Sequence, residues 1–248
     1  MNMLEPSRRS VLAGTGALLL AGCVSTKAGL SDPIVETAQG RYRGANTGGV
    51  QVFKGMRYGA NTGGRNRFMP PQPAPKFASV REALRYGDST PQVRTDFTKL
   101  DAISEDCLRI NVWTPAADTQ KRPVLLWFHG GGFEAGNGSS DVYDGTRMAL
   151  RGDVVVCTIN HRLNVFGFCD LSAVTANGYE QSGNVGYLDL VASMKWVREN
   201  IAAFGGDPNN IMIYGQSGGG RKVSVCFAGA EANGLFQKGI VQSGSHNK

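Results

Sequence analysis

Cysteine and histidine are scarce in this sequence, and neither type is arranged as a metal site requires. The 248 residues include five cysteines and three histidines, with no C-x-x-C pair and no two histidines close together. Zinc and similar ions need such ligands clustered at short spacings. The sequence therefore predicts no metal and no cofactor. Cys157 and Cys226 lie inside apolar runs and are expected to be small buried hydrophobic side chains.

A basic cluster and an internal repeat are also absent. The formal net charge is +6, but the basic residues are dispersed without interleaved aromatic residues, which argues against a nucleic-acid partner. The 34 glycines and 10 prolines follow no fixed period, which excludes collagen-like and low-complexity structure. With 41% apolar residues, the chain has enough material for a substantial globular core.

No apolar run is long enough to span a membrane as a stable helix, but the amino terminus has the features of an export signal. Arg8 and Arg9 precede an uncharged stretch at 11–22, which resembles a bacterial twin-arginine signal. Residues 20–23, L-A-G-C, resemble a lipobox in which Cys23 is lipidated and becomes the first mature residue. An ordinary signal peptide with a coincidental cysteine is the alternative.

The export signal therefore takes residues 1–23, and residues 24–248 form the fold. We expect a location in the bacterial periplasm or on a membrane as a lipoprotein, with the lipid on Cys23 as the contact with the bilayer.

The first part of the fold is predicted to be antiparallel. Short strand-like runs at 34–37, 40–44 and 50–55 alternate with glycine, as in a small meander. Residues 107–113 alternate apolar and polar side chains, as in a half-buried strand.

The later part has the pattern of a mostly parallel, doubly wound α/β sheet. Continuous apolar runs at 123–128 and 154–159 are typical of strands that are covered on both faces. Apolar residues recur at helical spacing over 186–201, and further strands are expected up to residue 214 and at 238–242. Strands that alternate with helices imply right-handed crossovers and this fold class.

Residues 215–219, G-Q-S-G-G, follow a β-rich run and precede a stretch of small residues. A G-x-S-x-G pentapeptide in this context indicates a nucleophile elbow, a tight strand-to-helix turn that lifts the serine hydroxyl clear of the sheet. Glycines flank the serine because side chains there would collide with the neighbouring strand and helix. Ser217 is therefore the candidate nucleophile, although the pentapeptide alone also occurs by chance.

Residues 129–133, H-G-G-G-F, follow directly on the apolar run that ends at Phe128. Ester hydrolysis passes through a tetrahedral oxyanion, and removing one preorganised donor typically costs ~3 kcal/mol of barrier. Glycines let backbone N–H groups approach that oxyanion, and an H-G-G-G loop forms the oxyanion hole of lipases and esterases. A generic glycine turn is the alternative, but a nucleophile on a later strand favours the oxyanion hole.

With these motifs in order, the chain resembles the type-B carboxylesterases, the family that includes the cholinesterases. One family signature matches residues 104–113, S-E-D-C-L-R-I-N-V-W, and the other matches 204–220, from F-G-G-D-P to G-Q-S-G-G-G. The resemblance implies an α/β-hydrolase fold and hydrolysis of a small carboxylic ester through an acyl-enzyme. It also implies that Ser217 is the nucleophile and that the N–H groups of Gly131, Gly132 and Gly218 form the oxyanion hole.

Three positions depart from the family pattern. The family usually has glutamate where Gln216 stands, so a buried charge beside the nucleophile is missing. It usually has alanine where Gly218 stands, so the elbow is expected to be looser. Cys107 usually pairs with an upstream cysteine, but the region 90–92 contains none, and we expect no such disulfide.

The acid and the histidine that activate a serine are not evident. In α/β-hydrolases they follow the serine in that order, and the sole candidates after Ser217 are Glu231 and His246. A helix of about ten residues after Ser217 would carry the chain about 15 Å toward the other end of the sheet. One candidate can then lie near Ser217, but not both. His129 and His161 are expected in structural or packing roles.

We therefore expect a truncated domain, the amino-terminal portion of an α/β-hydrolase, with an unpaired sheet edge and impaired activity. Two functions fit this sequence. The first is a serine carboxylic-ester hydrolase that acts through Ser217. The alternative is a non-catalytic surface lipoprotein that uses a hydrolase-like scaffold for binding. Gln216 and the missing triad partners are compatible with this alternative, whereas the intact serine and glycine loop argue against it.

Overall fold

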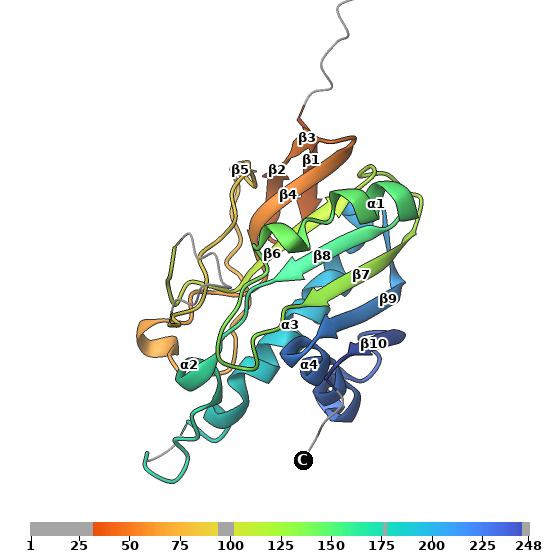
Figure 1. Cartoon of the computed structure of the whole chain (residues 1–248). Coiled ribbons are helices and arrows are strands. Elements are labelled where there is room, and N and C mark those ends of the chain that lie inside the picture. Colours follow the sequence, from red (N-terminus) through yellow and green to blue (C-terminus); the bar gives the residue numbers. More distant parts are fainter. Residues whose placement is uncertain (1–31, 94–101, 176–177, 245–248) are drawn as a thin grey trace, which may run out of the picture. The chain divides into compact units, whose positions relative to one another are not determined.

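A seven-stranded mixed sheet forms the centre of the computed structural model, which describes residues 32–93, 102–175 and 178–244. The strand order is β10-β9-β7-β8-β6-β4-β3 (Figure 1). The strands are β3 (Ala45–Thr47), β4 (Val50–Arg57), β6 (Arg109–Thr114), β7 (Arg122–Phe128), β8 (Val155–Ile159), β9 (Gly206–Gln216) and β10 (Lys238–Gln242). The four strands from β10 to β8 are parallel, and β6, β4 and β3 add to them in antiparallel fashion.

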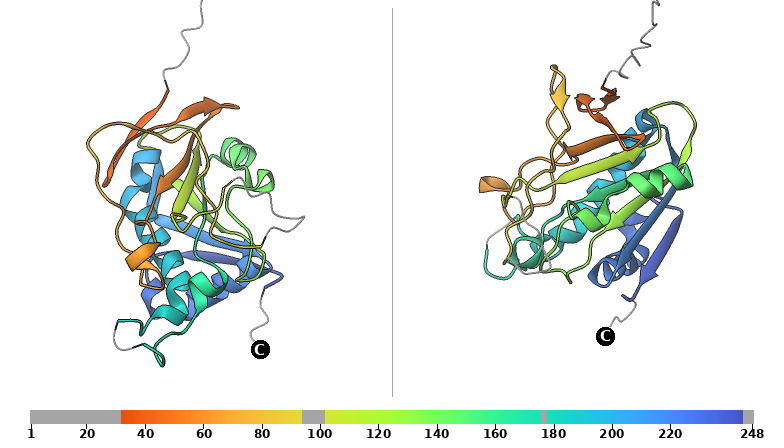
Figure 2. Two further views of the ribbon diagram at one scale, coloured as in Figure 1. Left: turned by 90° about the vertical axis from the view of Figure 1, so that its left-hand side faces the viewer. Right: turned by 45° about the horizontal axis from the view of Figure 1, so that its top comes forward.

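The helices cover both faces of this sheet because the direction of strand addition reverses at β7. From β7 the chain moves outward to β8 through α1 (Thr146–Gly152). It then returns through α3 (Val185–Asn200) to β9 on the other side of β7, and continues through α4 (Gly218–Ala228) to β10. Right-handed crossovers in opposite directions place α1 on one face and α3 and α4 on the other (Figures 1 and 2). This is the predicted doubly wound fold.

Shorter helical segments join these elements. They are the α-helix α2 (Asn164–Phe168) and the 3₁₀ turns η1 (Gly64–Asn66), η2 (Asp141–Tyr143), η3 (Ser182–Asn184), η4 (Ile201–Phe204) and η5 (Ala230–Ala232). In the part of the chain that the structure describes, no helix is both long and apolar enough to cross a bilayer.

The two faces of the sheet carry separate apolar clusters. Leu126 and Ile213 belong to the larger cluster, which includes residues of α3 and α4, whereas Trp113, Ala149 and Val156 belong to a smaller cluster under α1. Neighbouring residues of one strand point to opposite faces, so these central strands are buried on both sides, as their continuous apolar sequences predict. Cys157 and Cys226 are buried free thiols in this core, as expected.

The expected strands at 34–55 are present, but they divide between two sheets. β1 (Ile34–Thr37) and β2 (Gly40–Arg43) form an antiparallel hairpin to which β5 (Arg81–Glu82) adds in parallel. β3 and β4 instead join the edge of the main sheet.

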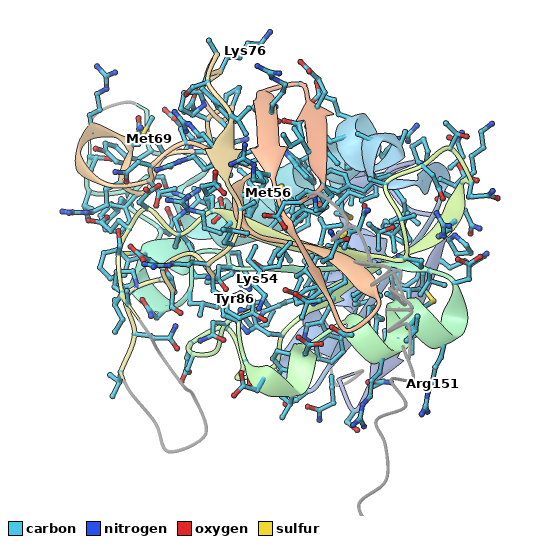
Figure 3. All side chains as sticks on the ribbon, turned by 90° about the horizontal axis from the view of Figure 1, so that it is seen from above. Lys54, Met56, Met69, Lys76, Tyr86 and Arg151 are labelled. Atoms are coloured by element: carbon cyan, nitrogen blue, oxygen red, sulfur yellow. The ribbon has the colours of Figure 1, made fainter. Side chains whose placement is uncertain are left out.

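A β-bulge in β4 reverses the direction of its side chains. The register to β6 shifts between Phe53 and Met56, and Gly55 takes a φ of 70° there. As a result Met56 is buried in the core, while Lys54 lies 4.3 Å above the ring of Tyr86 (Figure 3). A bulge inserts an extra residue and so lets both neighbours keep their preferred environments.

The prediction of a half-buried strand at 107–113 was wrong in one respect. β6 is buried along almost its whole length, because Ile110 and Val112 face the larger cluster while Trp113 faces the smaller one. Its polar member, Asn111, is buried and donates to the Thr158 hydroxyl at 2.9 Å. Because Asn111 is buried with a hydrogen-bond partner, the apolar–polar alternation of this segment looks like that of a half-exposed strand although the strand is buried.

Candidate active site

Ser217 occupies a sharp turn between β9 and α4, at the carboxyl end of the central strands. Its backbone has φ 56° and ψ −121°, which is unusual for a residue with a side chain and costs of order 1–3 kcal/mol. The Ser217 amide donates a 2.8 Å hydrogen bond to the carbonyl of Gln242 at the end of β10. The surrounding backbone therefore holds the strained turn, and the serine side chain is exposed. This is the geometry expected of a nucleophile elbow.

The elbow tolerates no side chain on the glycine two residues after the serine. A Cβ placed on Gly219 would overlap the carbonyl oxygen of Phe128, the last residue of β7. The first turn of α4 therefore packs directly against the backbone of the neighbouring strand. This contact explains the glycine that the motif requires.

The glycine loop that follows β7 lies against the elbow. Gly131 and Gly132 have φ values of 90° and 67°, and the amide of Ala135 donates to the Gly131 carbonyl at 3.1 Å to close the turn. A Cβ on Gly218 would overlap the amide nitrogen of Gly132, and a Cβ on Gly130 would lie 3.7 Å from that of Ser217. The structure thus brings together all four residues predicted for the nucleophile and the oxyanion hole.

Contacts from two other segments hold the glycine loop in place. The Gln92 amide group both donates to the Gly136 carbonyl at 2.9 Å and accepts from the Gly136 amide at 2.7 Å. The backbone amide of Asn164 donates to the Phe133 carbonyl at 2.7 Å. Gln92 lies in the region 90–92, which lacks the cysteine that the family resemblance implies as a partner of Cys107. Nothing in the sequence around Gln92 indicates that it supports the loop.

His129 and His161 are buried and stack on each other with ring centroids 5.0 Å apart. The Nδ1 atom of His129 lies 2.8 Å from the Gly130 carbonyl, and that of His161 lies 2.7 Å from the Arg162 carbonyl. Burial, reinforced by the nearby Lys222, holds the pKa of both rings well below 6.5. The Nε2 atoms have no hydrogen-bond partner, so neither ring bonds to the Ser217 hydroxyl. Both histidines are consistent with the packing roles expected for them.

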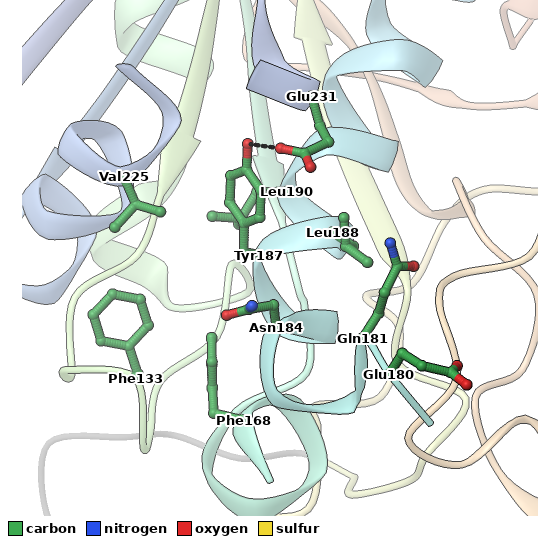
Figure 4. Close-up of a pocket in the computed structure, with 10 residues that line it drawn as sticks. All are labelled: Phe133, Phe168, Glu180, Gln181, Asn184, Tyr187, Leu188, Leu190, Val225 and Glu231. Carbon is green, nitrogen blue, oxygen red and sulfur yellow. Dashed lines mark hydrogen bonds between the residues drawn. The ribbon is translucent and has the colours of Figure 1, made fainter. Parts of the chain in front are cut away.

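Glu231 is engaged away from the elbow. It lies in η5, beyond the end of α4, and accepts a 3.2 Å hydrogen bond from the Tyr187 hydroxyl of α3 (Figure 4). Burial and this hydrogen bond raise the pKa of Tyr187 to about 12. Both residues line an open pocket of about 450 Å³ that Phe133 borders at the other end. His246 and Cys23 lie outside the residues that the structure describes.

Lys222 is a buried cation that sequence reasoning missed. Its side chain is 0% exposed, and its Nζ atom donates to the carbonyl of His129 at 2.8 Å. Burial lowers the pKa of Lys222 to about 7. Its position in α4 could have indicated this burial. Lys222 directly precedes Val223 and lies four residues before Cys226, and both of these residues face the core. A lysine on the apolar face of a helix needs a buried partner.

Comparison with known proteins agrees with this geometry. The model of the carboxylesterase family matches residues 31–248. The chain belongs to the carboxylesterase family. It is 41% identical over 220 residues to the para-nitrobenzyl esterase of Bacillus subtilis, which covers 87% of this chain and 44% of that protein. It is 39% identical over 255 residues to human carboxylesterase 3, with 94% of this chain and 43% of that protein covered.

Solved structures in this family share the fold. The Geobacillus stearothermophilus carboxylesterase EST55 superimposes with a TM-score of 0.80 at 51% identity, over 86% of this chain and 43% of that chain. An esterase from Clostridium hathewayi, described as able to hydrolyse aliphatic aromatic polyesters, superimposes with a TM-score of 0.79 at 43% identity, over 84% of this chain and 43% of that chain. The fold is therefore that of an α/β-hydrolase, and the chain spans less than half the length of these relatives.

Proposed function

We propose that this protein is a serine carboxylic-ester hydrolase in which Ser217 forms the acyl-enzyme. The observation that carries the proposal is the contact between the strained elbow at Ser217 and the glycine loop. The N–H groups of Gly131, Gly132 and Gly218 are the donors for the oxyanion. Two motifs that lie far apart in the sequence meet at one point, where ester chemistry needs both.

The reaction follows from this arrangement. The Ser217 oxygen forms a bond to the ester carbonyl carbon as its proton passes to water, and the negative charge moves to the carbonyl oxygen beside the glycine amides. Collapse of this intermediate breaks the bond to the alcohol, which leaves with a proton, and an acyl-serine remains. Water then attacks the acyl group and releases the acid. Each oxyanion donor typically contributes about 3 kcal/mol to such a step.

We infer that proton transfer from Ser217 is the weak step in this chain. In the described residues, neither His129 nor His161 bonds to the serine, and Glu231 is paired with Tyr187. A serine hydroxyl without a base reacts slowly. Esters with good leaving groups should therefore acylate Ser217, and the acyl group should persist because deacylation also needs a base.

A non-catalytic binding role is the second candidate, and the exposed Gln216 beside the serine is the observation that favours it. Either function is compatible with export and with lipid attachment at Cys23, which we propose from the amino-terminal sequence. Metabolic labelling with a fatty-acid probe, compared between the unaltered chain and Cys23→Ala, tests the attachment. Label that persists in the variant contradicts it.

Acylation by p-nitrophenyl acetate distinguishes the two functions. We expect one equivalent of p-nitrophenolate to be released without further turnover, and acetate to be found on Ser217 by peptide mass spectrometry. Ser217→Ala should remove both signals. Ser243→Ala is the matched control, because Ser243 is also exposed with a φ of 51°, and it should behave like the unaltered protein. A folded chain in which Ser217 stays unmodified supports binding only.

A further inference from the structure

The side chain of Lys222 joins the helix that begins at the elbow to the loop that is proposed to bind the oxyanion. Lys222 lies in the second turn of α4, five residues after Ser217, and its Nζ atom donates to the His129 carbonyl at 2.8 Å. The same atom lies 5.7 Å from the centre of the Phe133 ring. The two ends of the glycine loop, His129 and Phe133, therefore both lie close to this one ammonium group.

This hydrogen bond fixes the first peptide group of the loop. The peptide between His129 and Gly130 is planar, so holding its carbonyl oxygen also sets the direction of its N–H group. The next residues, Gly131 and Gly132, have little conformational preference of their own. A Cβ on Gly219 would also lie 3.0 Å from the His129 oxygen, so the first turn of α4 confines the same carbonyl group. The helix α4 thus positions the glycine loop at its first residue, His129.

The charge of Lys222 has no acidic partner in the part of the chain that is described. The titratable groups that face it are His129 after β7 and His161 after β8, and both rings are held neutral. Arg162, which follows His161, is paired with Asp189 at 2.7 Å. A buried cation without a counter-charge makes the surrounding potential positive, and an oxyanion nearby would benefit from it.

We propose that Lys222 is a positioning residue for the oxyanion loop, which holds the His129–Gly130 peptide so that the following glycine amides face Ser217 and which adds positive potential there. This inference rests on the proposed role of Ser217. Because burial lowers the pKa of Lys222 to about 7, its charge is present at pH 6 and largely lost at pH 9, whereas the amine can still donate its hydrogen bond. The two contributions are therefore separable by pH.

The experiment measures how fast a fluorophosphonate modifies Ser217, at pH 6 and pH 9. In this reaction the bond from Ser217 oxygen to phosphorus forms, the bond from phosphorus to fluorine breaks, fluoride leaves, and the hydroxyl proton passes to water. We expect Lys222→Met to slow labelling about tenfold at pH 6, and by less at pH 9. Lys222→Gln, which keeps a donor without the charge, should be slowed at pH 6 and match the unaltered protein at pH 9.

Arg221→Met is the matched control, because it removes an exposed cation from the adjacent position of α4. Its labelling rate should stay within about twofold of the unaltered protein at both pH values, since exposed charges are well screened. Lys222→Met labelling at the unaltered rate at both pH values would overturn the inference. So would an equal effect of Arg221→Met.

Hydrogen exchange supplies a readout that does not depend on reactivity at Ser217. We expect the amides of Glu134 and Ala135, which donate to the Gly131 carbonyl, to exchange at least about tenfold faster in Lys222→Met, and to keep their protection in Lys222→Gln and Arg221→Met. Unchanged protection in a folded Lys222→Met protein overturns the positioning role. If the unaltered chain is not labelled at Ser217, the proposed function fails, and exchange still decides the role of Lys222. If Lys222→Met does not fold, Lys222→Leu replaces it in both measurements, because leucine also supplies neither the charge nor the hydrogen-bond donor.

Discussion

The amide of Ser217 donates a 2.8 Å hydrogen bond to the carbonyl oxygen of Gln242, so the last strand of the described sheet supports the elbow directly. Gly244 completes this support, since a Cβ there would lie 2.5 Å from the Ser217 carbonyl and 2.7 Å from the Arg221 amide. The position of β10 at the edge of the sheet therefore matters for the site as well as for the fold.

Gly244→Ala should misplace the serine. The added methyl group must push either the elbow or the loop after β10 away, and we expect labelling of Ser217 by a fluorophosphonate to fall about tenfold, because reactive geometry is sensitive to shifts of about 1 Å. Labelling rates measured by intact-protein mass spectrometry provide the check. Ser243→Ala changes the adjacent exposed residue and should have little effect. Equal rates for Gly244→Ala and the unaltered protein would show that β10 does not support the elbow.

Gly218→Ala should harm this protein. Here a Cβ on Gly218 would overlap the Gly132 backbone, so the glycine loop must move outward. We expect a loss of stability of about 1–3 kcal/mol, typical of overpacking, together with slower labelling of Ser217. Urea unfolding measures the first effect. Gly152→Ala is the control, because its Cβ would lie 3.4 Å from Val154 and should fit. A more stable or more reactive Gly218→Ala protein contradicts the packing described.

Lys222 should make stability depend on pH. Its pKa falls from 10.5 to about 7 on folding, so between these values the unfolded chain binds more protons and stability rises with pH. The cost of burying its charged form is absent above pH 10.5 and grows as pH falls to about 7, with a slope of about 1.4 kcal/mol per pH unit. The difference in unfolding free energy between the unaltered protein and Lys222→Met, measured from pH 7 to 9, isolates this slope from other groups. A constant difference would mean that Lys222 is not buried as a titrating amine.

The ion pair between Arg162 and Asp189 should be essential to folding around the end of β8. Asp189 is fully buried and accepts from the Arg162 side chain at 2.7 and 2.9 Å and from its amide at 3.0 Å. Asp189→Asn leaves a buried guanidinium uncompensated and should cost about 3–5 kcal/mol in urea unfolding. Glu82→Gln removes the partner of Arg43 in an exposed pair and should cost less than about 1 kcal/mol. Similar losses in the two variants would contradict the burial of the first pair.

The elbow and the glycine loop were predictable because both depend on backbone geometry that a few glycines specify. Ser217, Gly131, Gly132 and Gly218 meet as the motifs indicate, and the runs at 123–128 and 154–159 are buried parallel strands as expected.

What could not be predicted depends on contacts between distant segments. Gln92 supports the loop from 44 residues away, and Lys222 bonds to a carbonyl 93 residues before it. Local patterns contain no information on such pairs. Asn111 similarly made a buried strand resemble a half-exposed one, because its partner Thr158 lies on another strand.

The site at which a fluorophosphonate modifies the folded protein tests most directly whether Ser217 is an activated nucleophile. We expect peptide mapping to find the phosphonyl group on Ser217 and urea-unfolded protein not to be labelled there. Ser217→Ala should abolish the modification, while Ser243→Ala should keep it. An unmodified Ser217 in folded protein, or modification of Ser217 that is as fast in the unfolded chain, would show that the elbow and the glycine loop do not activate this serine.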